Sequence, residues 1–127
     1  MTPEQIAARM REQRSVWVDL PATLGEGLRV RVERPAEAEF GEYLQPAEQG
    51  KVKWSCNLDQ VKRVVTGWSG FTEATFIESG ASDEVPFSAA LWGAWVADHV
   101  AAARPVADKV VTMLAAHEVS TADTEKN

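Results

Sequence analysis

The sequence predicts a small α+β domain in which one β-hairpin packs against several helices. Residues 16–20 and 28–33 alternate apolar and polar side chains with a period of two, which is typical of half-buried strands. Residues 88–117 instead repeat apolar side chains at helical spacing. With 127 residues, 45% of them hydrophobic and 25% charged, the chain suits one domain with its own core. We expect this single domain over residues 1–117 and a disordered polar tail over residues 118–127.

The first expected element is a short N-terminal helix. Thr2 is placed to cap it, Pro3 suits the first helical position, and Gln5 follows Thr2 at the spacing of a capping box. Ile6 and Met10 are four residues apart and therefore share one face of the helix. Because a helix this short is marginal in water, it needs a partner surface.

The β-hairpin follows this helix. In its second strand Leu28, Val30 and Val32 are expected to face the core, with charged side chains between them facing water. The segment 21–27 contains Pro and Gly and predicts the turn. Since a lone hairpin is marginally stable, helices must cover its apolar face. A third short strand is left open, and residues 51–54 are expected to be extended or irregular.

The middle of the chain predicts two helices and a long connection. The first helix is expected over residues 35–44 and the second over residues 57–66, where Gly67 ends it. Residues 68–87 are expected to form a connection without regular structure, and a connection of this length is usually functional or mobile.

A pair of helices is expected at the C-terminal end. Ser88 is placed to cap the first, whose apolar stripe runs over residues 92–103. Pro105 is expected to interrupt or kink the helix, and a second stripe continues over residues 106–117.

The charge balance bears on the class of partner. The formal net charge is −6, so broad binding to a nucleic-acid backbone is disfavoured. Lys51 and Lys53 beside Trp54 could gather with the strand arginines into a nucleic-acid patch, but the acidic balance counts against this. No apolar run approaches the roughly 20 residues that span a bilayer.

Candidate catalytic and metal-binding residues are few. His99 and His117 each lie on an apolar helical stripe without a partner at ligand spacing, so both are expected to be half-buried structural residues. Cys56 is the only cysteine, which excludes an intrachain disulfide and a cysteine zinc site and fits a cytosolic protein. Without a surrounding nucleophile signature it is expected to act as a small buried apolar residue. We therefore expect no enzyme activity, no cofactor and no metal.

Aromatic residues are the most informative feature. The chain has five tryptophans and one tyrosine, and tryptophan is enriched where protein surfaces meet. The candidate partner-binding residues lie around the long connection and the helix after it: Trp68, Phe71, Phe87, Trp92 and Trp95. One interpretation is that about half of this aromatic group builds the core. The other is that it forms a groove for a helix of another chain.

Three short motifs, taken in order, resemble a known family. They are Val-Arg-Val-Glu-Arg-Pro at 30–35, Gly-Trp-Ser-Gly-Phe at 67–71, and Val-Pro-Phe-Ser at 85–88. Over roughly residues 16–117 this order is similar to that of the tail assembly chaperones of long-tailed bacteriophages and their prophages. The chain departs from the family in a longer loop between the last two motifs, and in Phe71 where a smaller aliphatic residue is common. Alanines also follow Ser88, where acidic residues are frequent in the family.

The resemblance implies a non-enzymatic role in the infected bacterium. Such chaperones bind the long helical tape measure protein, keep it soluble and help to recruit tail tube subunits. They act in the host cytoplasm and are absent from the mature virion. Two alternatives stay open: an acidic phage protein that inhibits a host protein, and a domain that binds a small ligand between hairpin and helices. Exposed apolar surface also leaves self-association into a homo-oligomer open.

Overall fold

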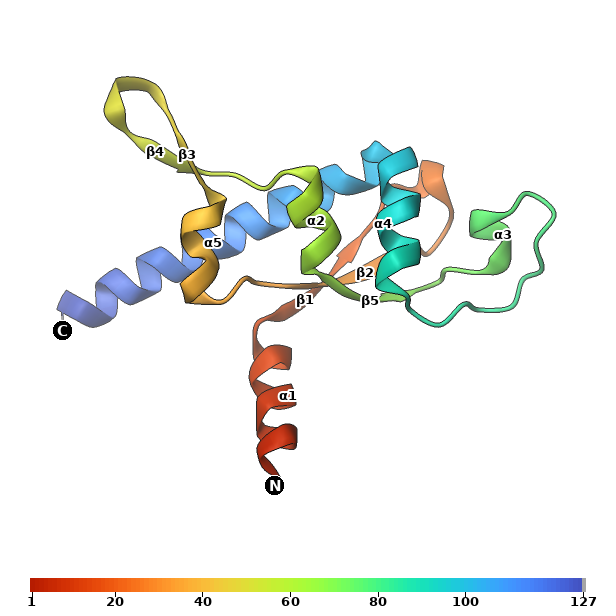
Figure 1. Cartoon of the computed structure of the whole chain (residues 1–127), viewed down its shortest axis with the longest axis horizontal. Helices are drawn as coiled ribbons and strands as arrows, with labels where there is room; N and C mark the ends of the chain where they lie inside the picture. Colours follow the sequence, from red (N-terminus) through yellow and green to blue (C-terminus); the bar gives the residue numbers. More distant parts are fainter. Residues whose placement is uncertain (127) are drawn as a thin grey trace.

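The computed structural model describes residues 1–126, with side chains described as far as Glu118 (Figure 1). The elements in chain order, with 3₁₀ helices written η, are α1 (Pro3–Gln13), β1 (Ser15–Asp19), η1 (Ala22–Leu24), β2 (Arg29–Glu33), η2 (Glu37–Tyr43), β3 (Leu44–Pro46), η3 (Glu48–Gly50), β4 (Val52–Trp54), α2 (Leu58–Val64), β5 (Val65–Ser69), α3 (Glu73–Phe76), α4 (Ala89–Asp98), η4 (Val100–Ala102) and α5 (Ala103–Lys126).

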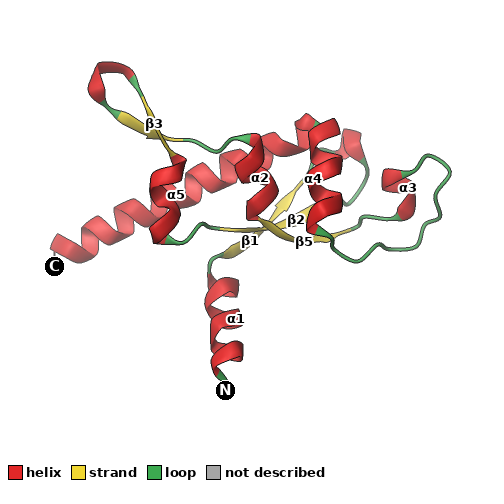
Figure 2. Ribbon diagram, in the orientation of Figure 1, coloured by secondary structure: helices red, strands yellow, loops and turns green. Residues whose placement is uncertain are grey.

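The α+β fold class is confirmed. Strands β1, β2 and β5 form an antiparallel sheet in that order, and β3 and β4 form a separate two-stranded ribbon. Helices α2, α4 and α5 lie together on one side of the sheet, whereas α1 extends away from it (Figure 1). The ribbon and the α3 segment project at opposite ends of the molecule (Figure 2).

The predicted hairpin is confirmed, and its faces are as expected. β1 pairs with β2 so that Val16 lies opposite Val32 and Val18 opposite Val30. Val18, Val30 and Val32 are buried against the helices. The other face carries Trp17, with the Arg29 guanidinium 5.3 Å from the centre of its ring.

The third strand of the sheet occupies residues that the sequence assigned to the end of a helix. The predicted helix over 57–66 begins as expected, because the Asn57 side chain accepts the Gln60 backbone N–H at 2.8 Å. It ends at Val64, however, and Val65–Ser69 becomes β5 with Gly67 inside the strand. Consecutive β-branched side chains favour the extended backbone there, and the open edge of β2 supplies the hydrogen-bond partners. The expected end at Thr66 is therefore wrong.

Two predictions for residues 35–54 need correction or completion. The expected helix over 35–44 is a 3₁₀ helix, η2, and Leu44 lies exposed in β3 instead of on an apolar helix face. Residues 51–54 are extended as expected, and they pair with β3 in the ribbon.

The C-terminal helical pair is confirmed, but its boundaries differ from those expected. Ser88 caps α4 through a hydrogen bond from the Leu91 backbone N–H at 3.2 Å. The break falls at His99, before η4, whereas Pro105 lies in the first turn of α5, where no intrahelical N–H bond is lost. The α5 backbone is helical through Lys126, so the predicted helix end near His117 is wrong. The sequence between these positions contains no Gly or Pro to stop the helix. The expected disorder of the tail from residue 118 stays a prediction.

The connection over 68–87 is more regular than expected. Trp68 and Ser69 belong to β5, and α3 occupies Glu73–Phe76. A bridge between Thr72 and Glu84 closes the base of the loop. Within the described residues 1–126, no helix is both long and apolar enough to cross a bilayer.

Candidate partner-binding site

The structure brings all five predicted aromatic residues into one cluster. The Trp68 ring stacks on Phe71 at 4.5 Å between ring centres and meets Phe87 edge-on at 5.1 Å. Phe71 in turn contacts Trp95 at 5.2 Å, and Trp95 lies 5.8 Å from Trp92. Phe76 of α3 joins the same group, which we call the aromatic cluster: Trp68, Phe71, Phe76, Phe87, Trp92 and Trp95.

Burial divides the cluster into an inner and an outer half. Phe71, Trp92 and Trp95 are each at most 5% exposed and belong to the hydrophobic core. Trp68, Phe76 and Phe87 are only partly buried. The interpretation that about half of the aromatic group builds the core is thus confirmed. Trp68 and Phe87 remain as the predicted residues that a partner could reach.

Backbone geometry holds the outer half in place. Gly70 has a φ of +87°, and the site of its missing Cβ lies 2.3 Å from the backbone oxygen of Gly27 in the hairpin turn. The chain can therefore turn tightly past the hairpin at this point only because residue 70 has no side chain. The turn carries the chain from the Trp68 ring at the end of β5 to the buried Phe71.

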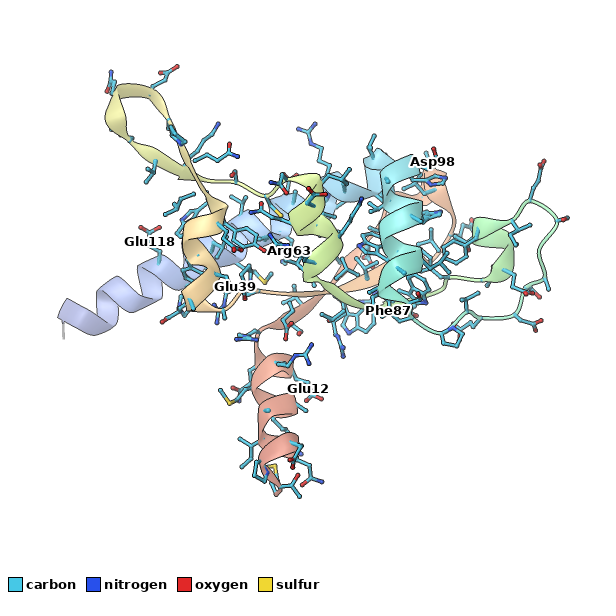
Figure 3. All side chains as sticks on the ribbon, viewed as in Figure 1. Glu12, Glu39, Arg63, Phe87, Asp98 and Glu118 are labelled. Carbon is cyan, nitrogen blue, oxygen red and sulfur yellow. The ribbon has the colours of Figure 1, made fainter. Side chains whose placement is uncertain are left out.

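Two hydrogen bonds then bring a second segment beside the first. The Trp68 indole N–H donates to the Val85 backbone oxygen at 2.7 Å, and the Val85 N–H donates to the Phe71 oxygen at 2.9 Å. Residues 68–71 and 84–87 thereby line a cleft of about 390 Å³, which we call the aromatic groove. Phe87 lies at the base of α4 in this region (Figure 3).

The loop beyond the groove is tied to itself through its backbone. The Glu73 N–H donates to the Asp83 oxygen at 3.2 Å, and the Ala74 N–H to the Ala81 oxygen at 3.0 Å. Phe76 packs inward on the aromatic cluster, whereas Ile77 and the acidic residues of the loop are exposed. The loop therefore presents an apolar side chain among carboxylates beside the groove.

The charge of this region is a sequence signal that the prediction did not use. Residues 64–103 contain five carboxylates and no lysine or arginine, so they carry five of the six net negative charges. Four of these carboxylates belong to the loop, and we call them the acidic rim: Glu73, Glu78, Asp83 and Glu84. Their field favours a partner with positive charge.

His99 has a structural role, as expected. Its ring stacks on Trp95 at 4.6 Å, and its Nδ1 lies 2.8 Å from the Trp95 backbone oxygen. Because a carbonyl oxygen only accepts, Nδ1 carries the proton in this contact. His99 thereby forms the C-cap of α4, with its ring packed on Trp95 of the core.

His117 also lies half-buried on its helix. Its Nε2 is 2.6 Å from a Glu37 carboxylate oxygen, and its ring meets Phe40 edge-on at 5.4 Å. The hydrogen bond from His117 lowers the pKa of Glu37. The neighbouring Trp54 indole donates to Glu118 at 2.8 Å, so this second group of contacts fastens α5 to η2 and the ribbon.

The basic residues do not gather into one patch. Arg29 pairs with Asp19 at 2.9 Å, and the Arg31 Nε donates to the Thr66 hydroxyl at 3.0 Å, both on the outer face of the sheet. Lys51 and Lys53 lie on the separate ribbon. The basic residues considered for a nucleic-acid patch are therefore divided between the sheet and the ribbon.

Cys56 is expected to react slowly with alkylating reagents. The residue is half-buried, and burial raises the pKa of its thiol from 9.0 to about 11. At pH 8 this lowers the thiolate fraction by about 100-fold, and only the thiolate is nucleophilic. The rate of iodoacetamide labelling should therefore be about 100-fold lower for the folded chain than for the chain unfolded in urea. Equal rates would show that Cys56 is accessible and reactive.

No family model, no curated protein and no solved structure matches the chain. Within the described residues, no group of three or more His, Cys, Asp or Glu side chains could hold a metal ion. The arrangement that stands out chemically is the aromatic groove with its acidic rim, which suits the burial of apolar side chains from another molecule.

Proposed function

We propose that this chain is a tail assembly chaperone of a long-tailed bacteriophage or prophage. In this role it binds the tape measure protein, keeps it soluble and helps to recruit tail tube subunits, without enzymatic activity. It acts in the host cytoplasm and leaves before the virion is complete. The observation that carries the proposal is the aromatic groove, because its partly exposed Trp68 and Phe87 rings offer apolar contact to one face of an amphipathic helix.

The motifs behind the family resemblance support this assignment by their position. Gly67–Phe71 forms one wall of the groove and Val85–Phe87 lies along the other, although the loop separates them in sequence. Ser88 of the third motif caps α4 and so fixes the direction in which Phe87 enters the groove. Two of the three motifs that carry the resemblance thus contribute to the candidate site.

The shape of the groove also fits a partner with many similar segments. Its partly exposed rings offer apolar contact with few fixed hydrogen-bond positions, so helices in different registers can use it. A long helical tape measure protein presents such segments repeatedly. The acidic surface around the groove keeps the chaperone soluble while part of its apolar surface stays open.

The proposal is tested by co-expression with the tape measure protein encoded beside this gene. We expect the tape measure protein to be soluble and to co-purify only when this chain is present. Phe87→Ala should weaken the complex by about 30-fold, because truncation of an aromatic hot spot costs about 2 kcal/mol.

The matched control is Trp17→Ala, which removes an aromatic ring from the opposite face of the sheet. It should leave recovery unchanged, and thermal unfolding of both variants verifies that each is folded. Failure of the wild-type pair to form a complex would overturn the proposal. If the Phe87→Ala variant recovered as much complex as the wild type, the aromatic groove would not be the binding site.

A further inference from the structure

Helix α1 offers a second surface, because its apolar face is not covered by any other part of the chain that the structure describes. None of its 11 residues is buried, and Ile6 and Met10 are 47% and 59% exposed on one face. The helix stands away from the rest of the fold (Figure 1). Its capping box at Thr2 and the Arg11–Glu33 ion pair at 2.9 Å fix its start and its direction, but neither covers its apolar face. A helix of this length gains most of its stability from such cover.

Charge selects which surface of this protein suits α1. α1 carries two arginines and two glutamates and is neutral overall, and Arg11 is paired with Glu33, but the exposed Arg9 is the charged residue next to the apolar pair. The outer face of the sheet pairs Arg29 with Asp19 and carries Glu33 as well as Arg31, so its charges balance, and the ribbon presents two lysines; neither surface attracts Arg9. The aromatic groove combines apolar side chains with the acidic rim and is complementary to α1 in both respects.

The position of α1 prevents it from reaching the groove of its own copy. It joins β1 at Ser15, which lies opposite Glu33 in the sheet. The groove begins at the other end, where Ser69 pairs with Arg29, the partner of Asp19. Arg14 also lies 3.4 Å from Glu33 and helps to hold α1 at its own end. A docked α1 must therefore come from another molecule.

We propose that α1 of one copy docks in the aromatic groove of a second copy. Ile6 and Met10 then cover Trp68 and Phe87, and Arg9 lies beside the acidic rim. Because helix and groove are different surfaces at opposite ends of the sheet, the contact is head-to-tail, and repetition gives open chains or a ring. The contact does not require the tape measure protein. A tape measure helix would compete with α1 for the groove.

The test uses two variants of the full chain in analytical ultracentrifugation across a concentration series. The helix variant Ile6→Glu/Met10→Glu changes only exposed side chains and keeps its groove. The groove variant Asp83→Lys/Glu84→Lys keeps its helix. We expect the wild type to associate with increasing concentration and each variant alone to associate at least tenfold more weakly. The control Glu48→Lys, a charge reversal on the ribbon, should associate like the wild type.

The two variants mixed in equal amounts give the decisive result. The groove variant supplies an intact α1 and the helix variant supplies an intact groove, so the mixture should form dimers and nothing larger. A monomeric wild type at every concentration would overturn the proposal, as would a mixture that stays monomeric. Undiminished association of either variant alone would also overturn it, since the contact would then involve another surface.

The outcome can be separated from that of the proposed function. The helix variant should still bind the tape measure protein, because its groove is intact, whereas Phe87→Ala should weaken both self-association and tape measure binding. Loss of self-association alone therefore leaves the chaperone proposal standing.

Discussion

Replacing Gly70 with alanine is expected to lower the free energy of unfolding by about 3–5 kcal/mol. The backbone of Gly70 has a positive φ, and an added Cβ would lie 2.3 Å from the Gly27 oxygen and 3.0 Å from its carbonyl carbon. Both atoms belong to the backbone, so no side-chain rotation relieves the clash. Either the hairpin turn or the end of β5 must move. Urea unfolding followed by circular dichroism measures the loss.

Gly50→Ala is the matched control for this prediction. Gly50 also has a positive φ, +72°, but no atom lies within 4 Å of the position that its Cβ would take. Its substitution therefore tests backbone strain alone and should cost about 1–2 kcal/mol. If the two variants lost equal stability, the close approach between Gly70 and Gly27 would not contribute.

Trp92→Ala is expected to lower the free energy of unfolding by about 3–5 kcal/mol. Trp92 is fully buried, its ring lies 5.8 Å from Trp95 and 6.5 Å from Phe71, and its indole N–H points to the Val61 oxygen at 3.4 Å. Truncation leaves a cavity between α4 and α2 and removes the indole contact with the Val61 oxygen. Since domains of this kind are stable by roughly 5–15 kcal/mol, the loss is a large share of the total. The same urea titration measures it.

Trp17→Ala provides the comparison for Trp92. The Trp17 ring is 44% exposed, with the Arg29 guanidinium 5.3 Å from its centre, so its removal should cost less than about 1 kcal/mol. A Trp92→Ala variant that weakened partner binding while retaining full stability would contradict its assignment to the core.

The sequence correctly predicted the helix N-termini and the buried faces of the hairpin strands, because both depend on residues close together in the chain. Thr2, Asn57 and Ser88 cap helices as expected, because each places a side-chain oxygen against a backbone N–H three residues later. The alternation in β1 and β2 likewise identifies their buried faces. These rules act within a few residues, and the sequence displays them directly.

Long-range contacts explain most of what was missed. Val65 continues the helical spacing of α2, so periodicity alone assigns it to the helix, and only the open edge of β2 makes it a strand. The aromatic cluster was found because its members lie near one another in sequence. Which of them would be buried depends on α3 folding over Phe71, and the sequence gives no signal for that contact. The run without basic residues from 64 to 103 was readable from the start and would have pointed to the acidic rim.

The backbone hydrogen bonds of the α3 loop have a consequence for how this protein can evolve. The links from Glu73 to Asp83 and from Ala74 to Ala81 join main-chain atoms, so they persist when the exposed side chains around them change. Gly80 is the exception, because a Cβ there would lie 2.5 Å from the Glu73 backbone. Mutation can therefore replace the charges and apolar groups of the loop and keep its path. Such a loop can follow sequence drift in a binding partner at little cost to the fold that supports it.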